Sequence, residues 1–255
     1  MEFHMDLSTL FILIAFGFFA SFIDSVVGGG GLISLPALLF SGLNPATAVA
    51  TNKLASTMGS LTSNIMFYRS GNINIKTGIK LFPLSVIGSI LGAWTVHWIN
   101  PNVLKPLMLV MLGGIAIYTI LKKDWGSVST PKKLSISHFI IFTLLIFAIG
   151  FYDGFLGPGT GSFLIFTFLL IGYDFLKAAG NAKFLNLGSN MGALLMFIYL
   201  GQVNFTFGII MGLAQIAGGV IGSKFAIKKG TGYIRALFIT VSFLLLAKNI
   251  YDYIH

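Results

Sequence analysis

The stretch Asp24–Pro36 has the sequence DSVVGGGGLISLP, which places four consecutive glycines inside a long apolar run. Each glycine costs a helix roughly 1 kcal/mol relative to alanine, so the apolar helix is expected to break here. Unwound backbone in lipid must find its hydrogen bonds within the protein or in a water-filled cavity. The stretch therefore predicts a broken helix within the membrane, followed by a short apolar run at residues 32–41.

A second stretch with the same arrangement lies 129 positions later, where residues 153–161 have the sequence DGFLGPGTG and a short apolar run follows at 162–172. Asp24 matches Asp153 at this offset, and Lys53 matches Lys183 at an offset of 130. The sequence therefore predicts two repeated halves. Further matches at an offset of 130 are Ala48 with Ala178, Met66 with Met196, Asn74 with Asn204, Gly78 with Gly208, Gly88 with Gly218 and Gly92 with Gly222.

The composition indicates a chain that meets lipid over most of its surface. Hydrophobic residues make up 56% of the 255 residues and charged residues only 9%, whereas soluble domains have about 25% charged residues. A membrane-spanning helix needs about 20 apolar residues. Runs of about this length are expected at 7–24, 46–68, 77–98, 103–121, 136–152, 176–199, 205–224 and 232–251.

Several functional classes are disfavoured. Without cysteine, the chain has no disulfide or thiolate chemistry. No spacing of His, Asp or Glu suggests a metal site and no Ser/His/Asp group suggests hydrolysis, so neither an enzyme nor a cofactor is expected. The net charge of +9 arises mostly from basic residues at the ends of apolar runs, which argues against nucleic acid as a partner.

The basic residues also predict an orientation. If each short apolar run crosses the membrane, each half has five crossings and the two halves are inverted relative to each other. With the N-terminus outside, the basic loops then fall in the cytoplasm. The predicted fold is an all-α polytopic membrane protein with a transmembrane repeat at 1–121, a cytoplasmic linker at 122–135 and a second repeat at 136–255. Re-entrant short runs would change the number of crossings.

The glycine motifs and the lysines within apolar runs, Lys53 and Lys183, together suggest an anion site. Free N–H groups and the dipole at a helix start attract an anion, and a cation within the membrane usually faces a cavity or a partner. The regularly spaced Ser56, Ser60 and Ser63, like Asn186 and Asn190, share a helix face that could line a pathway. The expected substrate-binding residues are Gly29, Gly30, Gly31, Thr51, Asn52, Lys53, Ser60, Gly159, Thr160, Gly161, Asn181, Lys183 and Asn190.

Each of these features has a purely structural alternative. The glycines could serve only to let helices cross closely, and the lysines could extend to the membrane interface. Asp24 and Asp153, which precede the two glycine motifs, could take part in proton coupling or could act as structural caps or ion-pair partners.

The whole chain resembles the sulfite exporter TauE/SafE family. The resemblance rests on residues 24–36, on AVATNK at 48–53, and on their second copies at 153–161 and 178–183. It implies secondary transport, generally export, of sulfur-containing anions such as sulfite, sulfoacetate and other organosulfonates. The second motif departs from the family pattern at Pro158 and Thr160, so the two halves need not contact a substrate equally.

The expected function is therefore export of a small sulfur-containing anion by alternating access in a bacterial inner (plasma) membrane. An anion channel, or a transporter of another small anion such as a carboxylate, remains an alternative. The absence of paired catalytic groups argues against a lipid-modifying enzyme. The polar residues at matched depths in both halves argue against a scaffold. The expected partners are the anionic substrate and the lipid bilayer, and homo-oligomerisation is left open.

Overall fold

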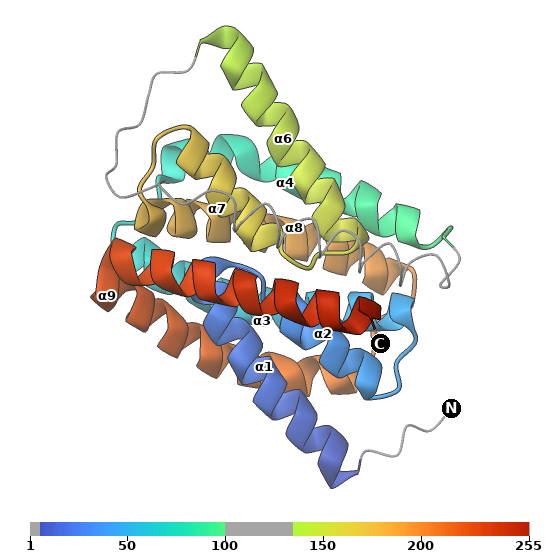
Figure 1. Ribbon diagram of the computed structural model, residues 1–255. Coiled ribbons are helices and arrows are strands. Elements are labelled where there is room, and N and C mark those ends of the chain that lie inside the picture. Colours follow the sequence, from blue (N-terminus) through green and yellow to red (C-terminus); the bar gives the residue numbers. More distant parts are fainter. Residues whose placement is uncertain (1–5, 100–134, 255) are drawn as a thin grey trace.

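The computed structural model describes residues 6–99 and 135–254, with side chains described up to residue 230. These residues form a bundle of helices (Figure 1). The helices are α1 (Leu7–Val27), α2 (Gly31–Phe40), α3 (Pro45–Arg69), α4 (Ile75–Val96), α6 (Ile136–Phe155), α7 (Thr160–Leu170), α8 (Phe175–Tyr199) and α9 (Phe205–Ile254).

Several helices start at a polar side chain that accepts a hydrogen bond from a backbone N–H three residues later. Asn44 caps α3, Asn74 caps α4 and Asp174 caps α8. Such caps satisfy an N–H group that has no partner within the helix. The caps explain why the observed helices begin within two residues of the apolar runs predicted at 46–68, 77–98 and 176–199.

Among the residues that the structure describes, four helical segments are long and apolar enough to cross a membrane: Leu7–Val27, Ile75–Val96, Ile136–Phe155 and Phe205–Gly230. By contrast, α2 and α7 have 10 and 11 residues, and are therefore about 15 and 17 Å long, roughly half of the apolar core of a bilayer. Each follows a glycine break, as the sequence predicts. The runs predicted at 205–224 and 232–251 both fall within α9, on either side of a break at Gly230. The span predicted at 103–121 and nearly all of the linker lie outside the described residues.

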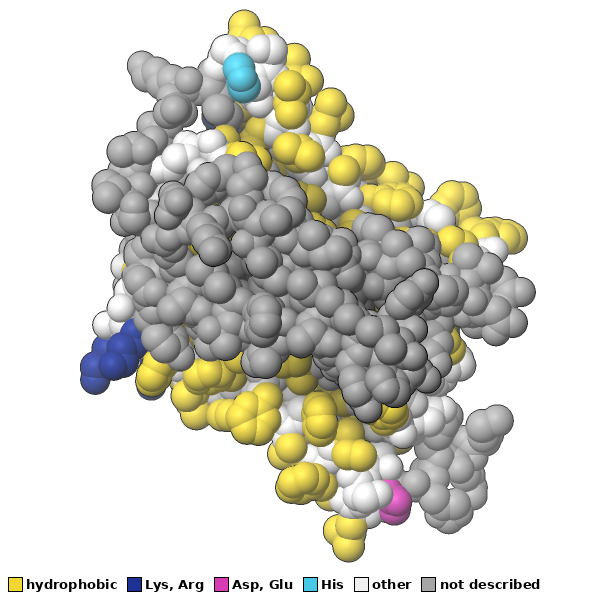
Figure 2. Space-filling model, viewed as in Figure 1, with side chains coloured by type: hydrophobic (Ala, Val, Ile, Leu, Met, Phe, Trp, Pro, Cys, Tyr) yellow, Lys and Arg dark blue, Asp and Glu magenta, His cyan; other side chains and the backbone are white. Residues whose placement is uncertain are grey.

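The outer surface is apolar, as expected of a protein surrounded by lipid. Large apolar side chains are exposed along α1 and α6, including Phe11, Phe19, Phe139 and Leu144. Figure 2 shows such side chains over the two helices at opposite edges of the molecule. The interior contains buried Ser, Thr, Asn, Lys and Asp side chains. Two apolar clusters fill the rest of the interior. Polar groups inside an apolar exterior are expected to serve one another or a cavity.

The two halves of the chain pack against each other through equivalent contacts. A Cβ atom on Gly218 in α9 would lie 2.1 Å from the carbonyl oxygen of Phe18 in α1. Likewise, a Cβ on Gly88 in α4 would lie 2.4 Å from the carbonyl oxygen of Phe147 in α6. These two contacts are related by the offsets of 129 and 130 found in the sequence. Small residues thus let helices from different halves approach closely, while α3 and α8 lie in contact between the α1–α9 and α4–α6 pairs.

Candidate functional site

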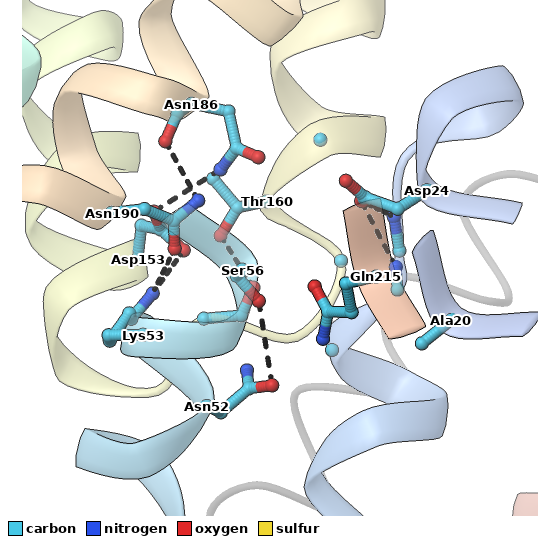
Figure 3. A pocket seen from close by; sticks show the side chains of 16 residues that line it. Ala20, Asp24, Asn52, Lys53, Ser56, Asp153, Thr160, Asn186, Asn190 and Gln215 are labelled. Atoms are coloured by element: carbon cyan, nitrogen blue, oxygen red, sulfur yellow. Dashed lines mark hydrogen bonds and ion pairs between the residues drawn. The ribbon is translucent and has the colours of Figure 1, made fainter. Parts of the chain in front are cut away.

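A small polar cavity lies where the two glycine motifs meet α3, α8 and α9 (Figure 3). The cavity has a volume of about 20 Å³, which is space for one or two water molecules. Its lining includes the first residues of both short helices, α2 and α7. The lining residues are Ala20, Asp24, Gly29, Gly30, Gly31, Asn52, Lys53, Ser56, Asp153, Gly157, Gly159, Thr160, Gly161, Asn186, Asn190 and Gln215.

One side of the cavity is formed by a buried ion pair between the two halves. Lys53 Nζ on α3 lies 2.7 Å from Asp153 Oδ1 on α6, and both side chains are at most 2% exposed. Lys53 also donates to Asn190 Oδ1 at 3.3 Å. The second carboxylate oxygen of Asp153 accepts hydrogen bonds from Asn186 and Ser189 on α8. These additional contacts offset the cost of removing two charges from water.

The equivalent residues form a second pair with the halves exchanged, in which the Lys183 side chain is fully buried and the Asp24 side chain is 21% exposed. Lys183 Nζ on α8 donates to Asp24 Oδ2 on α1. The other oxygen of Asp24 accepts the backbone N–H groups of Gly29 and Gly30, at 3.0 and 3.1 Å. Asp24 therefore fixes its own glycine motif and binds the lysine of the other half. Each lysine predicted from the sequence thus has a carboxylate partner.

The two aspartates differ in their remaining contacts because of Pro158. In the second half Pro158 occupies the position of Gly29, counted from the aspartate. Proline has no N–H to donate, so the second glycine motif cannot bind its aspartate as the first one does. The Asp153 carboxylate instead takes donors from α8. Pro158 is a position at which this chain departs from the family pattern, and the physical consequence of that departure is the loss of a backbone donor to Asp153.

The comparison with known proteins identifies the family of the chain. Residues 13–249 match the sequence profile described as "Sulfite exporter TauE/SafE". This chain belongs to the sulfite exporter TauE/SafE family. Membership covers both glycine motifs, both Lys–Asp pairs and all the helices that line the cavity. No solved structure matches the chain.

Proteins that are similar to this chain in sequence are named as probable membrane transporters. A "Probable membrane transporter protein ORF9" from Sinorhizobium sp is 38% identical over all of this chain and 96% of its own length. A "Probable membrane transporter protein" from Haemophilus influenzae is 36% identical over 99% of this chain and 98% of its own length. The protein YfcA of Escherichia coli K12 bears the same description at 36% identity, over 91% of this chain and 86% of its own length. The chain is accordingly a membrane transporter of the TauE/SafE family.

Most of the residues predicted for the site lie together in this cavity. They are Gly29, Gly30, Gly31, Asn52, Lys53, Gly159, Thr160, Gly161 and Asn190, with Asp24 and Asp153 beside them. Lys183 lies behind the lining, in contact with Asp24. Ser60 is buried but outside the lining.

Thr51 and Asn181 lie away from the cavity and bind backbone instead. Thr51 Oγ1 accepts the N–H of Asn204 at 3.0 Å, and Asn181 Oδ1 accepts the N–H of Asn74 at 2.9 Å. Thr51 and Asn181 are equivalent positions, and each holds the residue that starts a helix of the other half. They therefore join the two halves at the α3–α4 and α8–α9 turns.

Gln215 on α9 is the polar cavity residue that the sequence analysis missed. The sequence does contain an indication of Gln215, because it is the one large polar residue in the otherwise apolar stretch 207–222. Its counterpart at an offset of 130 is Ser85, so the repeat gives no indication of its importance. Among the described residues, no group of three or more His, Asp or Glu side chains could hold a metal ion.

Proposed function

We propose that this transporter exports a small sulfur-containing oxyanion, such as sulfite, across the bacterial plasma membrane. The observation that best supports the proposal is the polar cavity between two helix starts, bordered by two Lys–Asp pairs that each join the halves. Helix starts and lysines are donors suited to an oxyanion. The family's description as a sulfite exporter supplies the substrate class.

Binding of the anion requires the cavity to change shape. Space for one or two water molecules does not accommodate a sulfur atom with three oxygens. Lys53 can make room and provide charge at once if it turns from Asp153 towards the anion. Because this ion pair connects the two halves, the same movement loosens one of the contacts between them. A carrier that opens alternately to either side needs this coupling between binding and movement.

We further propose that the halves are inverted relative to each other, with the α3–α4 turn in the cytoplasm and the α8–α9 turn outside. The equivalent contacts between halves support this arrangement. So do the charges, because Arg69, Lys76 and Lys80 flank the first turn, whereas residues 199–206 contain no basic residue. Basic residues favour cytoplasmic loops.

Single cysteines can test the topology directly, because the chain has none of its own. Lys76→Cys and Thr206→Cys change exposed, equivalent residues at the starts of α4 and α9. We expect a membrane-impermeant maleimide to label Thr206→Cys in intact cells and Lys76→Cys only after the membrane is permeabilised. Labelling of both from the same side would contradict the inverted arrangement.

Flux into proteoliposomes tests the transport proposal. We expect saturable sulfite flux above that of protein-free vesicles, with a formate control that moves more slowly. An imposed proton or sodium gradient should drive sulfite against its own gradient if the protein is a coupled carrier. Flux that runs only down the sulfite gradient and does not saturate would favour a channel. Faster flux of formate than of sulfite would favour a carboxylate transporter.

A further inference from the structure

Gln215 brings a polar side chain from α9 into a cavity otherwise formed by the glycine motifs, α1, α3, α6 and α8. Its side chain is buried, with 3% of the residue exposed, and it lines the cavity. Figure 3 shows it between Ser56 on one side and Asp24 on the other. A Cβ atom on Gly59 would lie 3.0 Å from both Cβ and Oε1 of Gln215, so α9 packs directly on α3 at this point.

The amide nitrogen of Gln215 has no hydrogen-bond partner. Among the described residues that line the cavity, it is the one fully buried side-chain donor in this condition. By contrast, Lys53, Asn190 and Asp153, which line the same cavity, are bonded to one another or to α8. A buried amide without a partner destabilises a protein, so such groups usually serve a ligand or an ordered water.

The charges around the cavity indicate what kind of ligand this donor meets. Lys53 and Lys183 are each balanced by an aspartate, so the four side chains contribute no net charge. The starts of α2 and α7 remain, and each carries the equivalent of about half a positive charge. Together they balance about one negative charge, whereas a doubly charged anion would leave about one charge uncompensated in a buried site.

We propose that Gln215 is a substrate-contacting residue, whose Nε2 donates to an oxygen of a singly charged oxyanion held between the starts of α2 and α7. The inference rests on the proposed function and refines it, since it names the charge of the substrate. The site then prefers hydrogensulfite-like anions to doubly charged ones of the same shape. Gln215 belongs to α9, which is part of neither glycine motif. Its side chain therefore supplies a contact that neither motif can make.

The test compares wild-type protein with Gln215→Met, an unbranched apolar replacement of similar length. Ser85→Ala is the matched control, because Ser85 is the equivalent residue, is buried, lies outside the cavity and donates to the Leu185 carbonyl. The probes are methanesulfonate and sulfate, which are both tetrahedral but carry one and two charges. Thermal-shift titrations give an apparent Kd for each probe, and sulfite flux is measured in proteoliposomes.

We expect wild-type protein to bind methanesulfonate more tightly than sulfate. Gln215→Met should weaken methanesulfonate binding by about tenfold or more, since a hydrogen bond to a charged group is lost. Its melting temperature without ligand should be unchanged or higher, because the unpaired amide is gone. Gln215→Glu keeps the shape but adds a carboxylate, and should weaken binding at least as much. Ser85→Ala should keep wild-type affinity.

Wild-type affinity and flux in both Gln215 variants would overturn the role of Gln215, and so would a lower melting temperature with unchanged affinity. Sulfate binding as tight as methanesulfonate binding would overturn the charge assignment. If one of these contradicting results is found but wild-type protein moves sulfite, the further inference fails and the proposed function stands. If wild-type protein neither binds nor moves any of these anions, the proposed function fails and the inference with it.

Discussion

Replacing Lys53 by Met is expected to abolish sulfite flux and to lower the melting temperature strongly. The change leaves the Asp153 carboxylate 2% exposed and without its cation. Removing one partner of a buried ion pair typically costs about 3–5 kcal/mol. It also removes the amine that we propose turns towards the anion. Thermal unfolding in detergent and flux in proteoliposomes measure the two effects separately.

The double variant Lys53→Met/Asp153→Asn separates stability from transport. It removes both charges, and an asparagine can keep its contacts with Asn186 and Ser189. We expect most of the lost stability to return, because no unpaired charge remains, while flux stays absent. Flux restored along with stability would show that Lys53 acts only as a structural partner of Asp153.

Lys177→Met serves as the control for the loss of a lysine. Lys177 lies 3.9 Å from Asp174 with its side chain 49% exposed. Exposed pairs of this kind contribute about 0–1 kcal/mol. The variant should therefore unfold and transport nearly as the wild type does, and a large effect would indicate that charge loss alone, rather than position, explains the Lys53 result.

The second large effect is expected at Gly28, where the two glycine motifs cross. A Cβ atom at this position would lie 2.3 Å from the carbonyl carbon of Gly161 and 2.4 Å from the nitrogen of Ser162. Both are backbone atoms at the start of α7, and they cannot turn aside as a flexible side chain can. The φ angle of Gly28, +69°, adds backbone strain. We expect Gly28→Ala to lose more than about 4 kcal/mol and to yield little folded protein.

Gly42→Ala provides the matched control, because Gly42 has a φ angle of +87° but no atom within 4 Å of an added Cβ. This variant has the backbone strain without the collision and should lose only about 1–2 kcal/mol. Folded yield by size-exclusion chromatography and the melting temperature compare the two. Equal losses would mean that the backbones of the two motifs are not in tight contact.

Much of the fold could be predicted from the sequence because breaks and apolar runs are local features. The glycine motifs predicted the breaks before α2 and α7, and the apolar runs predicted the long helices within a few residues. The repeat also identified Lys53 with Lys183 and Asp24 with Asp153. These inferences need only periodicity, propensity and self-comparison.

The partners of these residues could not be predicted in the same way. A repeat relates positions within each half, but it does not say which faces of the two halves meet. The sequence therefore allowed ion pairs only as an alternative to an anion site, and it did not show that Lys53 meets Asp153 and Lys183 meets Asp24 across the halves. Thr51 and Asn181 were expected at the site for their polarity, yet they hold turns of the opposite half. Gln215 was missed because its equivalent in the other half, Ser85, is a different type of residue, so the repeat does not draw attention to it.

The exchange of contacts between halves also sets an order of events during synthesis. Lys53 is translated 100 residues before Asp153. The α9 glycines that pack against α1 are translated about 200 residues after the α1 residues that they contact. The first helices are therefore made before the aspartate that pairs with Lys53 and before the glycines that pack against α1. Contacts so distant in the chain form late. The first half therefore completes its buried contacts only after the second half has been made.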